Sequence, residues 1–194
     1  MIATPTAHKI LLLVGPFVAA ILLPLVFHTV KSVDSSYGQI ANHSIDNFSF
    51  ASGHQFNDYQ GRYLFAFFGY QGCSQSCPRQ LLNLLALAQQ PSLADSTFVY
   101  VDLAPNPHAN ASTASLEDNA VHYQQVTDIA QTRRLSAQLP GFISTGYQQQ
   151  VVDHSAYIYL IDPQGVVRRV YGQLTLNLEQ VINDLNQLQQ ESML

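Results

Sequence analysis

The chain has 194 residues, and 47% of them are hydrophobic, which is enough for one packed domain with an appended segment. Only 11% are charged, the formal net charge is −5, and no cluster of lysine or arginine is present, so nucleic acid is excluded as a partner. The two cysteines, Cys73 and Cys77, are too few for a disulfide-stapled fold and indicate a metal or redox site.

The first predicted element is an uncharged apolar run over residues 10–27, which contains Gly15, Pro16 and Pro24. Its length just reaches the roughly 20 residues that a membrane-spanning helix needs, and membranes tolerate glycine and proline in such helices. A cleaved secretory signal is the alternative. The run is longer than a typical signal core and no clear cleavage site follows it, so we favour an uncleaved anchor.

We therefore expect a membrane anchor over residues 1–30, a polar linker over 31–45 and a folded domain over 46–194. Lys9 and Lys31 flank the span, so the positive-inside rule nearly balances. The mostly polar remainder of the chain follows the span. We expect a single-pass protein of the inner (cytoplasmic) membrane whose soluble domain lies in the periplasm.

Strand and helix patterns alternate from residue 46 onward. Strands are predicted at residues 48–50, 63–70, 97–102 and 121–126. The run over 63–70 is continuously apolar, as in a central strand that is covered on both faces. After it, apolar residues at helical spacing predict a helix over 73–90 that Pro91 ends, and residues 105–119 have the composition of a loop.

The carboxyl-terminal third contains two more helices and a hairpin. Thr127 is expected to cap a helix that Pro140 and Gly141 end. Residues 157–161 and 166–170 flank a turn at 162–165, and Asn177 begins a final amphipathic helix over 177–188. This order predicts an α/β domain with a sheet that is parallel on one side and antiparallel on the other, as in the thioredoxin fold.

Cys73 and Cys77 lie where a buried strand joins a helix, and ligands of open α/β folds collect at such ends. A spacing of four on a helix would place both sulfurs on one side, and the helix amino terminus favours thiolates. This arrangement suits metal binding and disulfide exchange alike. The alternative without a function is a pair of buried core cysteines or an inert disulfide. Against it, Cys73 lies in a glycine-rich turn and not at a core position.

His154 precedes the strand predicted at 157–161, in a loop that a thioredoxin-like topology places against the cysteine helix. Redox thioredoxins carry a cis-proline there, whereas this chain offers an imidazole. One imidazole and two thiolates suit copper in either oxidation state, or zinc. Asp153 is a candidate to orient the ring. Asp102 either accepts a hydrogen bond near the site or caps a turn, and His108 is a substitute ligand or a solvated loop residue.

Several motifs occur together in one order: Phe67-Phe-Gly-Tyr70, Cys73-x-x-x-Cys77-Pro78, a strand ending in Asp102, and Asp153-His154-Ser155 before a strand. By this ordered combination the chain resembles the Sco/SenC family of copper proteins over residues 46 to 188. The resemblance implies a copper ion held by Cys73, Cys77 and His154. It also implies delivery of copper to the dinuclear copper centre of cytochrome c oxidase, or reduction of that centre's cysteines.

The chain departs from the family beside the ligands. Ser74 and Gln75 stand where the family usually has Pro-Asp, and residues 103–109 lack the usual charged residues. The ligands are retained while the flanking surface has changed, so these departures bear on the delivery target more than on the metal. The resemblance implies a metallochaperone rather than a turnover enzyme, with the copper-bearing oxidase subunit or another copper-assembly protein as partner. Two alternatives stay open: a thiol–disulfide oxidoreductase that uses Cys73 and Cys77 as its redox pair, and a copper- or redox-responsive sensor.

Overall fold

The computed structural model describes residues 36–70, 76–104, 116, 118–146 and 151–193. Ser36–Leu194 form one compact unit, and Met1–Ser35 form the other, which lies outside the described residues. In the described ranges no helix is long and apolar enough to cross a membrane. The anchor expected within residues 1–30 falls outside these ranges and stays a prediction, as does the division of the chain into three parts.

A six-stranded mixed sheet forms the centre of the unit, in the order β1-β8-β7-β2-β3-β4. Its strands are β1 (Gln39–Ser44), β2 (Leu64–Gly69), β3 (Thr97–Asp102), β4 (His122–Gln125), β7 (Ile158–Ile161) and β8 (Val166–Tyr171). The pairs β2–β3 and β3–β4 are parallel, whereas β2–β7, β7–β8 and β1–β8 are antiparallel. The predicted α/β class and mixed sheet are confirmed.

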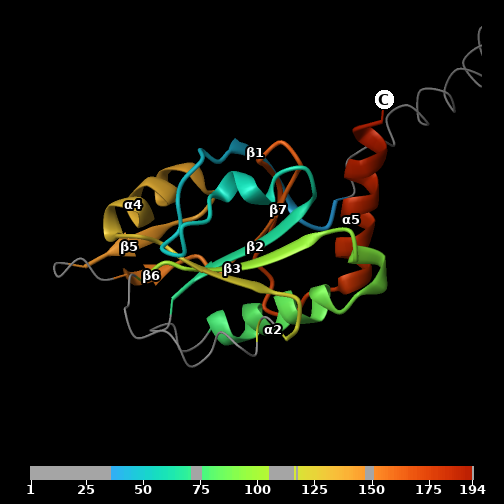
Figure 1. Cartoon of the computed structure of the whole chain (residues 1–194). Coiled ribbons are helices and arrows are strands. Elements are labelled where there is room, and N and C mark those ends of the chain that lie inside the picture. The colour runs from blue at the N-terminus through green and yellow to red at the C-terminus, as the bar shows by residue number, and fades with distance from the viewer. Residues whose placement is uncertain (1–35, 71–75, 105–115, 117, 147–150, 194) are drawn as a thin grey trace, which may run out of the picture. The chain divides into compact units, whose positions relative to one another are not determined.

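Helices cover both faces of this sheet (Figure 1). They are α2 (Cys77–Ala88), α4 (Ile129–Gln138) and α5 (Leu178–Glu191), with short 3-10 turns at Phe56–Tyr59 and Pro91–Leu93. Side chains of β2 alternate between two cores: Phe65 and Phe67 pack with α2 and α5, while Ala66 and Phe68 pack with α4. A strand buried on both faces explains the continuous apolar run in the sequence.

The segment predicted as a linker contains a strand. β1 pairs antiparallel with β8, with Gln39 opposite Val170 and Ser44 opposite Val166. It is the edge strand of the sheet, and most of its residues are exposed. An edge strand can be polar on both faces, so it shows no hydrophobic alternation from which it could be predicted.

Two local predictions are corrected in detail. The strand expected at residues 48–50 is reduced to isolated bridges, Ser49 with Gln55 and Phe50 with Val126. The cap of α4 is Asp128 rather than Thr127, because the Asp128 carboxylate accepts from the backbone N–H of Gln131 at 2.8 Å. Both residue types cap helices well, so sequence alone separates neighbouring candidates poorly.

Candidate metal centre

Two of the three predicted ligands meet at the amino-terminal end of α2. Cys77 is the first residue of α2 and His154 is the last residue of β6 (Val151–His154). The Cys77 Sγ lies 3.2 Å from the His154 Nε2, and both residues are buried. Cys73 lies outside the described residues, so the three-ligand set stays a prediction.

The start of α2 differs from the prediction. The helix begins at Cys77, with Ser76 as its N-cap residue and proline in its first turn. Proline is favoured there because the first helical N–H groups have no partner within the helix. The prediction that both cysteines lie on one face of the helix required a helix that begins at residue 73, whereas α2 begins at Cys77. Cys77 is disulfide-bonded, and the sequence contains one other cysteine, Cys73.

Three groups besides Cys77 surround the His154 side chain. The backbone of Phe68 hydrogen-bonds the imidazole, and the Tyr70 ring packs edge-to-face on it with centroids 5.2 Å apart. Burial lowers the pKa of His154, while Asp153 and the Phe68 hydrogen bond oppose this shift. Burial thus favours the neutral imidazole, the form that binds a metal.

Asp153 makes a different contact from the one expected. Its Oδ1 accepts a hydrogen bond from the backbone N–H of His154 at 2.8 Å. The ring itself is hydrogen-bonded by the backbone of Phe68, in addition to its contact with the Cys77 sulfur. A backbone carbonyl can orient a ligating histidine as well as a carboxylate does, but sequence patterns do not reveal it.

The segment that carries His154 is a strand where a loop was expected. β6 pairs antiparallel with β5 (Ile143–Thr145), and Ile143 lies opposite His154. Ser155 and Phe142 extend the pairing, since Ser155 N–H donates to the Phe142 carbonyl at 2.8 Å and Phe142 N–H donates to the Ser155 hydroxyl at 3.0 Å. Strands of three and four residues are too short to give a periodic signal.

Gly141 permits this close approach. Its φ is +116°, and a Cβ added there would lie 2.9 Å from the Ser155 side chain. Only glycine adopts such a backbone without strain while leaving this space. The sequence indicated Gly141 as a helix stop, and its contact with the segment that follows His154 was missed.

Asp102 ends β3 beside Gly69, its partner in the parallel pairing with β2. The residue is fully buried, and its carboxylate accepts from the Ala104 N–H at 2.9 Å and the Tyr123 hydroxyl at 3.1 Å. These contacts match the turn-cap interpretation. Burial raises the pKa of Asp102 above its ordinary value of 3.8. The loop with His108 lies outside the described residues, so that alternative ligand stays untested.

Replacing Asp102 with asparagine should stabilise the domain at pH 7 by on the order of 1 kcal/mol. The asparagine carbonyl can still accept from Ala104, and its amide can donate to the Tyr123 hydroxyl, without a buried charge. Because the pKa of Asp102 is raised on folding, native Asp102 lowers stability as pH rises above about 4, whereas asparagine does not. Urea unfolding of both proteins at pH 3 and pH 7 measures the difference in their free energies of unfolding. The same difference at both pH values would contradict the role given to the Asp102 charge.

The Cys77 and His154 donor atoms fit one metal ion. Metal–sulfur and metal–nitrogen bonds of about 2.3 and 2.0 Å join donors that are 3–4 Å apart, and the 3.2 Å between the Cys77 Sγ and the His154 Nε2 matches this separation. The Cys77 sulfur becomes a metal donor when its disulfide is reduced. Within the described ranges no group of three or more His, Cys, Asp or Glu side chains forms a complete metal site. The predicted third donor, Cys73, lies outside these ranges.

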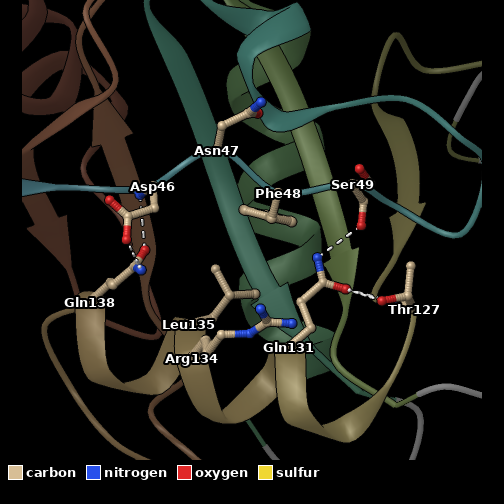
Figure 2. A pocket seen from close by; sticks show the side chains of 9 residues that line it. All are labelled: Asp46, Asn47, Phe48, Ser49, Thr127, Gln131, Arg134, Leu135 and Gln138. Carbon is tan, nitrogen blue, oxygen red and sulfur yellow. Dashed lines mark hydrogen bonds between the residues drawn. The ribbon is translucent and has the colours of Figure 1, made fainter.

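A separate pocket lies between α4 and the segment 46–49 (Figure 2). Its polar side chains bond one another: Gln138 exchanges hydrogen bonds with Asp46, and Gln131 bonds Thr127 and the Ser49 carbonyl. Neither Cys77 nor His154 lines this pocket. The candidate metal centre is therefore distinct from it.

The sequence model of the family described as SCO1/SenC matches residues 42–190. A curated relative, Protein sco1 of Schizosaccharomyces pombe, is 26% identical over 127 residues, which are 60% of this chain and 48% of that protein. The chain thus spans about half the length of this relative.

Solved structures of low identity share the fold. A SCO1/SenC family lipoprotein from Bacillus anthracis superposes with a TM-score of 0.62 at 21% identity, covering 77% of this chain and 97% of its own. BsSco, described with a disulfide switch as a member of the Sco family of cytochrome c oxidase assembly proteins, gives 0.59 at 15% identity, with 78% and 96% covered. Yeast Sco1 with copper bound gives 0.56 at 18% identity, with 77% and 87% covered. The thioredoxin-like Sco fold is confirmed.

Proposed function

Because this chain belongs to the SCO1/SenC family, we propose that it is a copper metallochaperone that binds one copper ion through Cys73, Cys77 and His154. The observation that carries the proposal is the contact between the Cys77 sulfur and the His154 Nε2 at 3.2 Å. These donors come from residues 77 positions apart, and the fold brings them together at one buried point.

Copper is favoured over zinc by the relatives and by the donor chemistry. Yeast Sco1 carries copper in its crystal structure. Thiolates are soft ligands that suit Cu(I), and imidazole suits Cu(II), so a mixed set can hold either oxidation state. Three protein ligands would also leave room for a donor from a receiving protein, as transfer of a cargo ion requires.

The proposed place of action is the periplasmic side of the inner membrane. The apolar run over residues 10–27 supports an uncleaved anchor, which would confine the domain to the membrane surface. The proposed partner is the copper-bearing subunit of cytochrome c oxidase or another copper-assembly protein. BsSco, which shares the fold, is described as a member of a family of oxidase assembly proteins.

A second candidate function is thiol–disulfide exchange, favoured by the disulfide-bonded state of Cys77. In this reaction the disulfide accepts two electrons and two protons from a partner dithiol, which becomes a disulfide, and the chain is left with two thiols. The reduced form is the one that binds copper, because thiolates are the ligands. Both functions can therefore belong to one site, with its redox state selecting between them.

Copper titration of the reduced and the oxidised chain tests the proposal. The reduced chain should bind one equivalent of copper and, with Cu(II), show a thiolate-to-metal charge-transfer band. The oxidised chain should bind at least about 100-fold more weakly, because both thiolate donors are lost. Equal copper affinity of the two forms would contradict the proposal that the cysteine thiolates are ligands. Tighter binding of zinc than of Cu(I) would contradict the proposal that the metal is copper. Mixing the loaded chain with the copper-free oxidase subunit then tests transfer.

A further inference from the structure

We propose that Gln80 is a positioning residue that holds the His154 segment against α2 and thereby tunes copper binding. The inference rests on the proposed copper site. It concerns a residue outside the ligand set, on the same helix as Cys77 and one turn further along. Sequence reasoning did not single it out.

The Gln80 side chain joins α2 to two other segments. The residue is 0% exposed, and its Nε2 donates to the Ala156 carbonyl at 2.9 Å and to the Gln173 carbonyl at 3.2 Å. Ala156 lies two residues after His154, so one bond of this amide acts close to the imidazole. The other bond reaches the segment that follows β8.

The orientation of this amide is determined by its partners. Both acceptors of Nε2 are carbonyl oxygens, which can only accept, and the Gln80 Oε1 accepts from the Asn83 Nδ2 at 2.9 Å. Asn83 also donates to the Leu174 carbonyl at 3.3 Å. Only an uncharged amide at position 80 satisfies all of these groups, since a carboxylate would face two carbonyl oxygens.

The His154 segment needs such support because its own sheet is small. β6 pairs with β5 in a two-stranded sheet, and an isolated two-stranded pair is marginally stable in water. Two side chains of α2 contact residues 154–156: the Cys77 sulfur lies against the His154 ring, and the Gln80 amide donates to the Ala156 carbonyl. Losing the Gln80 bond removes the contact between α2 and the backbone beside His154, and leaves the imidazole held by Cys77, the Phe68 backbone and the Tyr70 ring.

The test replaces Gln80 with methionine, which has similar volume but no amide, and uses Gln131→Met as the matched control. Gln131 is also a buried glutamine on a helix, with Nε2 donating to the Ser49 carbonyl at 2.9 Å and Oε1 accepting from Thr127 (Figure 2). Its helix, α4, packs in the core on the opposite face of the sheet from α2. Both variants lose comparable bonds, and only one of them touches the His154 segment.

Two readouts separate positioning from general stability. In the copper-free reduced chain, Gln80→Met should speed amide exchange at residues 155–157 about tenfold, while Gln131→Met leaves it unchanged. Gln80→Met should also weaken copper binding about 10- to 100-fold and shift the charge-transfer band, whereas Gln131→Met should do neither. If Gln80→Met fails to fold, Asn83→Ala removes the bond to the Gln80 Oε1 instead. That variant should speed exchange at residues 155–157 and weaken copper binding by several-fold each, less than Gln80→Met would.

The outcomes also separate this inference from the proposed function. Unchanged exchange at 155–157 in Gln80→Met, or equal copper weakening in Gln131→Met, overturns the positioning role. A wild-type chain that binds no copper overturns the proposed function, and the exchange result then still decides whether Gln80 holds the segment. If Gln80→Met shows faster exchange at 155–157 but binds copper like the wild type, Gln80 holds the segment without influencing copper affinity, and that part of the inference is wrong.

Discussion

Replacing His154 with alanine should weaken copper binding at least about 100-fold and abolish the charge-transfer band that the wild-type site gives with Cu(II). The imidazole is the donor that lies 3.2 Å from the Cys77 sulfur, and alanine supplies no atom in its place. Loss of a residue that only supports a ligand typically costs 10- to 100-fold in affinity, so loss of a ligand should cost more. Competition with a Cu(I) chelator and absorption spectroscopy measure both effects.

His43→Ala is the matched control, because His43 lies exposed on β1. This variant should bind copper as tightly as the wild-type chain. Thiol titration should give two free thiols in each reduced variant, which shows that the cysteines are intact. Full copper affinity in His154→Ala would contradict the three-ligand site and leave the dithiol alone. Disulfide reduction that survives in that variant would instead support thiol exchange as a separate function.

Features with local causes were predictable from the sequence. The turn between β7 and β8 forms because the Asp162 carboxylate accepts from the N–H groups of Gln164 and Val166, both at 2.9 Å, and Gly165 has a φ of +85°. Asn177 caps α5 by accepting from the Gln180 N–H at 3.2 Å. Such signals act within a few residues, so a pattern in the chain contains them fully.

Features that depend on distant partners were missed. β1 is a strand because β8 offers it a partner, and its own polar residues do not indicate this. β5 and β6 are likewise short and stabilise each other. The approach of His154 to Cys77 was predicted from topology. Its supporting contacts were missed, because one comes from the backbone of Phe68, which its motif does not reveal, and the other from Gln80, which belongs to no motif.

Replacing Asp184 with alanine should destabilise the domain by about 3 kcal/mol or more. Asp184 lies on α5 and is 3% exposed, and its carboxylate accepts from the N–H groups of Tyr37 and Gly38, both at 2.8 Å, and from the Tyr171 hydroxyl at 3.0 Å. Alanine leaves these donors without their acceptor in a largely buried place, which costs more than the net value of the bonds themselves. Urea unfolding of the reduced domain measures the loss.

Tyr171→Phe provides the comparison, since it removes one of the three donors and should cost only about 1 kcal/mol. Gly38 packs so closely on the Tyr171 ring that an added Cβ would lie 2.6 Å from it, so the two contacts hold the same segment. If Asp184→Ala lost no more than Tyr171→Phe, the backbone N–H groups would contribute nothing and this account of the carboxylate would be wrong. A loss near 3 kcal/mol would identify Asp184 as the group that fixes where the chain enters β1, the strand that sequence patterns took for a linker.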